Sequence, residues 1–175
     1  MHEQVVFDTP WFQLVAKTPP GWDSPHYSIR TQDYVNVVAA SPETGLLLVR
    51  QFRPAVGRVT LELPSGHVEP DEAPEQAARR ELLEETGHEA GAMHLLGCLS
   101  PDVGRLGNRM WCFFSGELRR VEAHPGEAGL QTVHYRGPLS ELLQRMEFDH
   151  ALQLASVFLA VAQGRLSLDG APGQE

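Results

Sequence analysis

Three glutamates and an arginine lie close together in a stretch of the sequence that begins at Gly66. Glu81, Glu84 and Glu85 are spaced by three and four positions, so a helix would place their carboxylates on one face. Arg80 lies four positions before Glu84 and could reach it across one helical turn. Clustered carboxylate oxygens are hard ligands that suit Mg²⁺, with Mn²⁺ as an alternative ion. A divalent ion held by carboxylates is the usual apparatus of phosphate chemistry, so the stretch indicates a metal-dependent reaction at phosphorus.

The charge of this stretch also has a simpler interpretation. Residues 66–88 hold seven carboxylates against two arginines, and like charges four apart on a helix repel by roughly 0.2–0.5 kcal/mol per pair. On charge alone, a solvated acidic helix face is the commoner explanation. A bound cation would offset the repulsion.

A helix over 74–86 would position these carboxylates. Pro74 suits the first helical turn, and Gly87 suits the position just past the end. Ala78 and Leu82 then form a neighbouring apolar stripe that can pack on a sheet. The acidic face and the packing stripe are therefore different sides of one predicted helix.

The spacing is more specific than the charge. The stretch matches Gly-x5-Glu-x7-Arg-Glu-apolar-x-Glu-Glu-x-Gly through Gly66, Glu72, Arg80, Glu81, Leu82, Glu84, Glu85 and Gly87. With each fixed residue type used at roughly 5–7% of positions, a chance match in this chain is rarer than about one in a million. This pattern resembles the signature box of the Nudix hydrolases, apart from the last position, where His88 replaces the usual apolar residue.

The resemblance implies a fold, a reaction and a set of roles. The fold is α+β, an α/β/α sandwich with a mixed central sheet. The reaction is hydrolysis of a nucleoside diphosphate linked to another moiety, by water attack at phosphorus with Mg²⁺. Arg80 would orient a glutamate, Glu72 would brace the loop or bind a further ion, and Glu84 and Glu85 are the catalytic carboxylates. The implied metal ligands are Glu81, Glu84, Glu85 and the backbone carbonyl of Ser65.

The resemblance extends to one branch of the family. The segment VRQFRPAVGRVTLELPSG, residues 49–66, is similar to ADP-ribose pyrophosphatases, which carry Gln-aromatic-Arg followed by Glu-apolar-Pro-x-Gly. It implies that Arg53 contacts the diphosphate and that Glu62 lies beside it, and an arginine fork does suit phosphate oxygens. Ser100–Pro101 and the later segment EFDHALQLASVFLA also fit this branch. ADP-ribose is therefore the first expected substrate, with AMP and ribose 5-phosphate as products.

One departure concerns the general base. Members of this branch commonly carry a glutamate in the loop after that Ser-Pro pair, but this loop has none. Asn108 stands near the expected position, and an amide cannot take a proton. Asp102 is the nearest carboxylate and is the candidate base; a metal-bound hydroxide, a box glutamate or Glu127 are the alternatives.

Further residues are candidates for binding the substrate. Arg105 and Arg109 could meet phosphates or a terminal sugar, or they could be solvated. Trp11, Trp22 and Tyr27 lie where this branch often builds a small antiparallel sheet that swaps across a homodimer and stacks an adenine. Trp11 is the candidate for base stacking, and packing at a core or dimer interface is the alternative for all three.

The remaining elements are read from apolar patterning. Strands are predicted over 11–18, 27–31, 34–40, 45–52, 59–64, 93–100, 109–118 and 130–136. Helices are predicted over 138–146 and 150–166, the latter with a core-facing stripe of Leu152, Ala155, Leu159 and Ala162. The expected organisation is N-terminal strands over 1–33 that form a dimerisation sheet, a Nudix domain over 34–165 and a tail over 166–175.

Composition limits the partners and the compartment. The chain has 175 residues and a formal net charge of -9, which argues against a nucleic-acid surface. Cys98 and Cys112 are too few for a disulfide framework, and the histidines show no zinc-site spacing. Neither a signal peptide nor a membrane span is apparent, so a cytoplasmic location is expected.

Three functions compete. The first is an ADP-ribose pyrophosphatase, and the second is the same chemistry on another substrate, such as a UDP-sugar, a GDP-sugar or a dinucleotide. The third is a catalytically silent module that binds a nucleotide or a protein. The intact box glutamates favour an enzyme, whereas the missing loop glutamate is the one feature that favours a silent module.

Overall fold

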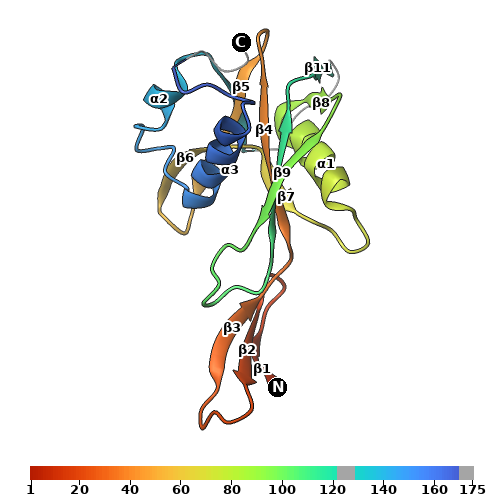
Figure 1. Ribbon diagram of the computed structural model, residues 1–175, viewed down its shortest axis with the longest axis vertical. Helices are drawn as coiled ribbons and strands as arrows, with labels where there is room; N and C mark the ends of the chain where they lie inside the picture. Colours follow the sequence, from red (N-terminus) through yellow and green to blue (C-terminus); the bar gives the residue numbers. More distant parts are fainter. Residues whose placement is uncertain (122–128, 170–175) are drawn as a thin grey trace.

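The computed structural model describes residues 1–121 and 129–169 and consists of a layered main body and a separate N-terminal sheet (Figure 1). The main body has a seven-stranded central sheet with helices on both faces. A three-stranded antiparallel sheet extends away from it at the N-terminal end. The α/β/α sandwich with a small N-terminal sheet, predicted from the sequence, is therefore confirmed.

The central sheet is mixed, as expected. Its strands run in the order β12-β5-β4-β10-β9, with β6 paired to β5 and β7 paired to β4. Only the β10–β4 pairing is parallel. The strands are β4 (Tyr34–Ser41), β5 (Gly45–Arg53), β6 (Arg58–Glu62), β7 (Ser65–His67), β9 (His94–Leu99), β10 (Met110–Ser115) and β12 (Gln131–Tyr135). A two-stranded ribbon of β8 (His88–Ala90) and β11 (Leu118–Arg120) lies beside it.

Helix α1 (Pro74–Thr86) covers one face of the sheet (Figure 1). Ala78 and Leu82 are fully buried against alternate residues of β4, as the predicted stripe requires. The helix ends where expected, because Gly87 adopts a φ of 69° and its N–H donates to the carbonyl of Leu83. That left-handed conformation is one that glycine adopts without strain.

Helices α2 (Leu139–Leu142) and α3 (Ala151–Ala162) cover the opposite face, and both are shorter than predicted. The stripe predicted for α3 is confirmed in part: Leu152 and Leu159 are half-buried and pack against the core, whereas Ala155 is half-buried and Ala162 is exposed. The fully buried positions are Gln153, Ser156, Val157 and Ala160. The reason is that two of these are polar residues whose hydrogen bonds are made inside the protein, so hydropathy does not reveal them.

The central sheet splits open below the β4–β5 hairpin. These two strands pair only near the turn, through Ala40–Leu46 and Ser41–Gly45. Further along, β4 pairs with β7 while β5 pairs with β6. The divergence leaves a gap in the sheet between strands that carry polar side chains.

The N-terminal sheet contains β1 (His2–Asp8), β2 (Gln13–Thr18) and β3 (His26–Arg30), all antiparallel. Strand β1 was not predicted, and its seven residues are all exposed, so no burial pattern marks it. The β9–β10 loop reaches this sheet, where Ile29 pairs with Leu106 and the N–H of Ile29 donates to the carbonyl of Arg105 at 2.7 Å.

The structure also describes the two cysteines and the lengths of the helices. Cys112 is buried and Cys98 is half-buried, and both are free. Of the helices in the described residues, none has the length and apolarity needed to cross a bilayer.

Candidate active site

A cavity of about 890 Å³ lies where β4 and β5 diverge. It is lined from both helix layers and from the N-terminal sheet. The polar residues around it are Gln32, Tyr34, Asn36, Gln51, Arg53, Glu62, Ser65, His67, Glu69, Arg80, Glu81, Glu84, Glu85 and His150. The box carboxylates, Ser65 and the Arg53–Glu62 pair therefore border one space, although they come from separate parts of the sequence.

Arg80 is the centre of a network on the α1 side. Its guanidinium holds both oxygens of Glu72, at 2.9 and 3.0 Å, and also binds Glu81 at 2.7 Å and Glu84 at 3.1 Å. A fifth contact, at 2.9 Å, goes to the backbone carbonyl of His67. Hydrogen bonds from Arg80 hold the pKa of Glu72 below its usual value, and that of Arg80 is raised mainly by Glu72. This network joins the loop to the helix and orients two of the three box carboxylates.

The loop before α1 is tied to the same carboxylates. The buried Glu85 accepts a hydrogen bond from the N–H of Ser65 at 2.8 Å. Gly66 faces the carboxylate of Glu81 so closely that there is no room for a β-carbon. Glu72 accepts the N–H of Glu69 at 3.0 Å, which closes the loop. These contacts explain why the box has a glycine at position 66 and a glutamate at position 72.

The donor set at this end of the cavity fits a divalent ion of the Mg²⁺ type. Glu81, Glu84, Glu85 and the neighbouring Ser65 supply only hard oxygen atoms. Within the described ranges, no three His, Cys, Asp or Glu side chains are already gathered at ligand spacing. The reason is that Arg80 holds Glu81 and Glu84 while the Ser65 N–H holds Glu85.

Arg53 and Glu62 form an ion pair on the α3 side of the cavity. The guanidinium donates two hydrogen bonds of 2.8 Å, one to each oxygen of Glu62. Glu62 also accepts from Thr60 at 2.6 Å and from Gln153 at 3.3 Å. Burial alone would raise the pKa of Glu62, but these hydrogen bonds and the charges of Arg53 and His150 bring it below its usual value. Glu62 is therefore an anion that fixes Arg53, and Arg53 keeps a cationic edge at the cavity.

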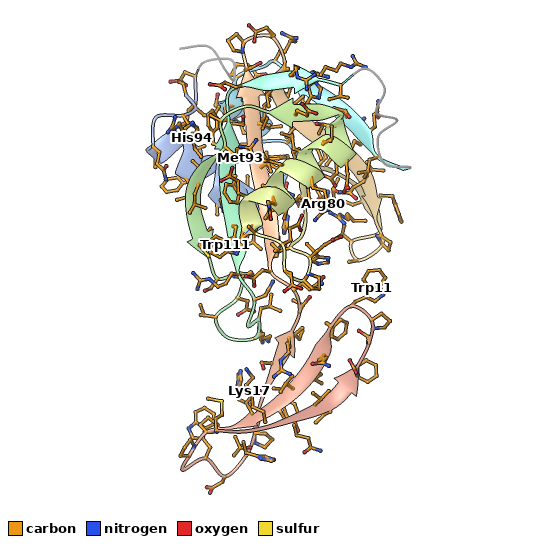
Figure 2. The ribbon with its side chains drawn as sticks, turned by 90° about the vertical axis from the view of Figure 1, so that its right-hand side faces the viewer. Trp11, Lys17, Arg80, Met93, His94 and Trp111 are labelled. Atoms are coloured by element: carbon orange, nitrogen blue, oxygen red, sulfur yellow. The ribbon has the colours of Figure 1, made fainter. Side chains whose placement is uncertain are left out.

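Trp11 borders the cavity from the N-terminal sheet of the same chain. Figure 2 shows it at the end of this sheet that faces the main body. The turn that carries it is held by Thr9, whose hydroxyl accepts the N–H of Trp11 and of Phe12 at 3.1 and 2.9 Å. Its side chain is largely exposed, so one ring face is open to a ligand or a partner.

The loop residues proposed from the sequence lie elsewhere. Asp102 and Arg105 pair with each other at 3.6 Å, and Asp102 accepts the N–H of Gly104. Arg109 contacts Cys98 and Ser100 on and beside β9. None of these three charged residues lines the cavity of this chain. Instead, their loop connects β9 and β10 to the N-terminal sheet.

Asn108 stands near the position of the missing glutamate, and Glu127 is an alternative base; only the first lies in the described part of the chain. Asn108 is buried, donates to the backbone carbonyl of Gln32 at 3.0 Å, and does not line the cavity. Glu127 lies outside the described residues. Among the described residues, the carboxylates that border the cavity are therefore Glu62, Glu69 and the three box glutamates.

Several polar residues of the cavity were not proposed as site residues from the sequence. Tyr34 and Asn36 alternate along β4, so their side chains share a face, and burial raises the pKa of Tyr34 to about 12. Gln51 precedes Arg53 by two positions on β5 and faces the same way. His150 stands just before α3. The period-2 spacing could have identified Gln51, whereas His150 carried no signal.

A second cavity, of about 940 Å³, lies at the far end of α3. Its lining is mainly apolar, with Phe114, Val161 and Leu166, and among the described residues Arg165 is its charged side chain. Without clustered carboxylates it offers no comparable chemistry, so the cavity at the box is the candidate active site.

Comparisons with known proteins identify the family of the chain. A family model described as the NUDIX domain matches residues 30–157. The ADP-sugar pyrophosphatase of Mus musculus is 35% identical over 116 residues, 58% of this chain and 53% of the relative. The ADP-ribose pyrophosphatases of Bacillus subtilis and Mycobacterium tuberculosis are 32% and 31% identical, over 61% and 70% of this chain and 58% and 62% of their own lengths.

The chain thus spans little more than half the length of these curated relatives. A crystal structure titled as an ADP compounds hydrolase superposes with a TM-score of 0.75 at 22% identity, covering 95% of both chains. At that identity the superposition establishes the fold.

Proposed function

The chain belongs to the NUDIX family, and from that premise we propose that it hydrolyses the diphosphate linkage of a nucleoside diphosphate sugar, with ADP-ribose as the first substrate. The observation that carries the proposal is the single cavity that joins two groups of residues. Box carboxylates border it from α1, and the Arg53–Glu62 pair borders it from the other side of the split sheet. A diphosphate between them would meet a cationic fork on one side and the metal-ligating oxygens on the other.

The names of the relatives support the substrate class. Two of those compared are ADP-ribose pyrophosphatases and one is an ADP-sugar pyrophosphatase. The exposed ring of Trp11 at the mouth of the cavity supports a substrate that carries a base, because such rings stack bases with roughly 1–3 kcal/mol in other proteins.

The proposed reaction adds one water across the bridging bond. The water oxygen bonds to one phosphorus, the P–O bond to the bridging oxygen breaks, and the products are AMP and ribose 5-phosphate. A bound Mg²⁺ would supply Lewis-acid activation of the phosphate and of the water, and Glu81, Glu84, Glu85 and the carbonyl of Ser65 would hold it. Arg53 would neutralise and orient the diphosphate, since its fork matches phosphate oxygens.

We assign the role of base to a box glutamate rather than to Asp102. Asp102 lies in the loop against the N-terminal sheet and does not border the cavity of its own chain. Glu84 borders the cavity, and about half of its side chain is exposed (47%). Glu85 is buried and accepts the Ser65 N–H, so it is better placed to hold an ion than to exchange protons with water.

The N-terminal sheet supports a homodimer as the working assembly. It exposes large apolar side chains, namely Val5, Val6, Phe7, Trp11, Phe12, Trp22 and Tyr27. Exposed apolar patches mark protein interfaces. Light scattering after gel filtration would measure the mass, and replacing Val5 and Phe7 by Ser should shift a dimer to a monomer. A wild-type chain that elutes as a monomer would remove this part of the proposal.

The experiment that tests the function is a turnover panel with Mg²⁺. ADP-ribose, ADP-glucose, UDP-glucose, GDP-mannose and a dinucleotide are compared, and chromatography resolves the products. AMP and ribose 5-phosphate released from ADP-ribose, at a kcat/KM above that for the other substrates, is the expected result. Preference for another sugar would keep the chemistry and change the substrate. No turnover with Mg²⁺ or Mn²⁺ would favour a silent binding module, the interpretation that the missing loop glutamate supports.

A further inference from the structure

His150 lies between two cavities and has no role in the reaction proposed above. It is the residue before α3, and it borders both the active-site cavity and a smaller cavity of about 340 Å³. Arg53 and Glu62 border both cavities as well. A group in the main cavity that reaches Arg53 therefore also comes near His150.

The backbone around His150 is held in place from both sides. On the C-terminal side, the side chain of Gln153 accepts the N–H of Leu63 at 2.7 Å and donates to Glu62 at 3.3 Å. On the N-terminal side, Asp149 pairs with Arg58 at 2.5 Å. The position of His150 relative to the Arg53–Glu62 pair is thus built into the fold.

The imidazole of His150 has hydrogen-bonding capacity to spare. Its ring makes no hydrogen bond within the described part of the chain, whereas Glu62 is already occupied by Arg53, Thr60 and Gln153. The ring is close enough for its positive charge to lower the pKa of Glu62. The N-terminal end of α3 adds a partial positive charge at the same place. An anion beside Arg53 would find a second donor here.

We propose that His150 is a substrate-binding residue whose protonated imidazole contacts the phosphoryl oxygens of the diphosphate next to Arg53, an inference that rests on the proposed function. The consequence is that substrate affinity should be higher at acidic than at basic pH, since histidine side chains in general carry a charge only toward acidic pH. The diphosphate of an ADP-sugar has no terminal monoester, so it lacks the ionisation near pH 6 that a monoester shows.

Several other charged or titratable groups lie around His150 or across the cavity from it. Near His150 they are Arg53 on β5, Arg58 and Glu62 on β6, and Asp149, which precedes His150 in the sequence. The remaining charged or titratable residues of the main cavity are His67, Glu69, Arg80, Glu81, Glu84 and Glu85. His67 is the other imidazole among them, so its contribution must be measured separately.

The test compares wild type with H150Q and H150K, using ADP-ribose with Mg²⁺ at about pH 5.5 and about pH 8.5. Calorimetric binding of ADP-ribose in EDTA supplies an affinity without turnover. H150Q should raise KM and Kd about tenfold at the lower pH, as expected for loss of one charge-assisted hydrogen bond. At the higher pH the two proteins should agree within about twofold.

Three variants, H150K, H94Q and H67Q, separate the explanations. H150K keeps a positive charge across this range and should bind well at both pH values. H94Q is the matched control: His94 is an exposed histidine on β9 that does not border the cavity, so its pH profile should equal that of wild type (Figure 2). H67Q measures the second imidazole, and a pH dependence of KM that disappears in H67Q and persists in H150Q would overturn the assignment.

The outcomes distinguish this inference from the proposed function. Wild-type turnover together with an unchanged pH dependence of KM and Kd in H150Q would refute the role of His150 and leave the function standing. A loss of kcat in H150Q with unchanged KM would refute it as well. Absence of both binding and turnover in wild type, across the whole panel, would overturn the function and this inference with it.

Discussion

The carboxylate of Glu81 occupies the place where a side chain on Gly66 would begin. A β-carbon built at position 66 would overlap both oxygens and the carboxyl carbon of Glu81. The glycine is not required for its backbone angles, because its φ lies outside the left-handed region. It is required because a carboxylate on α1 packs directly against the loop.

We therefore expect G66A to displace Glu81 and to lower Mg²⁺-dependent turnover at least about tenfold, which corresponds to about 1.4 kcal/mol in the activation free energy. The measurement is kcat/KM as a function of Mg²⁺ concentration, with circular dichroism to confirm the fold. G107A is the matched control, since a β-carbon there meets no atom within 4 Å. Equal activity of G66A and wild type would show that Glu81 is not needed in its observed position.

Glu85 is the box carboxylate whose loss should be most costly. It is buried at the cavity, and the Ser65 N–H can still donate to the amide oxygen of a glutamine. E85Q should therefore keep the melting temperature and lose about a thousandfold or more in kcat, which is about 4 kcal/mol. E75Q is the control, because Glu75 is exposed, pairs with Arg79 and does not line the cavity. Turnover of E85Q near the wild-type rate would remove Glu85 from the metal site.

Much of this site could be predicted because its information is local. The spacing of Glu81, Glu84 and Glu85 is set by one helix, and the residues that start and end that helix are adjacent to it in sequence. The pairing of Arg53 with Glu62 follows from a short hairpin, in which these residues lie on neighbouring strands. In each case a few residues and one regular element determine the geometry.

The other wall of the cavity could not be predicted, because it depends on contacts between distant segments. Tyr34 reaches the site only because β4 leaves β5 and pairs with β7. His150 reaches it because Gln153 fastens α3 to β6. Asp102 was proposed as the base because it is the carboxylate in the loop after Ser100–Pro101, but this loop turns toward β3 and pairs Leu106 with Ile29. No local sequence pattern predicts these contacts between distant segments.

Arg80 should not tolerate replacement by lysine. Its guanidinium spans two oxygens of Glu72 together with Glu81, Glu84 and a backbone carbonyl, and a lysine ammonium is a point charge that cannot bridge them. R80K should lower kcat/KM about ten- to hundredfold while the protein remains folded. R79K, the neighbouring arginine that contacts Glu75 and the carbonyl of Ala90, should stay close to wild type. Equal losses in both variants would point to a general effect on α1 instead.

His88 should make the fold sensitive to acid. It is buried where the box usually has an apolar residue, and its ring lies edge-on to that of His134 with centroids 5.5 Å apart. Burial lowers the pKa of His88, and the charges of His134 and Arg120 act in the same direction, against a hydrogen bond to the carbonyl of Thr86. The folded state therefore favours the neutral ring. Its contribution to stability is complete above the unfolded pKa of about 6.5 and is lost as pH falls from there through the lower folded pKa.

Replacing this histidine by leucine should remove that part of the acid sensitivity. The melting temperature of wild type should fall between about pH 8 and about pH 5, and that of H88L should fall less. In a chain of this size about 1 kcal/mol moves the melting temperature by about 2–4 °C, so the difference is measurable by calorimetry. H94Q, at an exposed site, should follow wild type. If H88L and wild type lose the same number of degrees over this range, protonation of His88 is not coupled to unfolding.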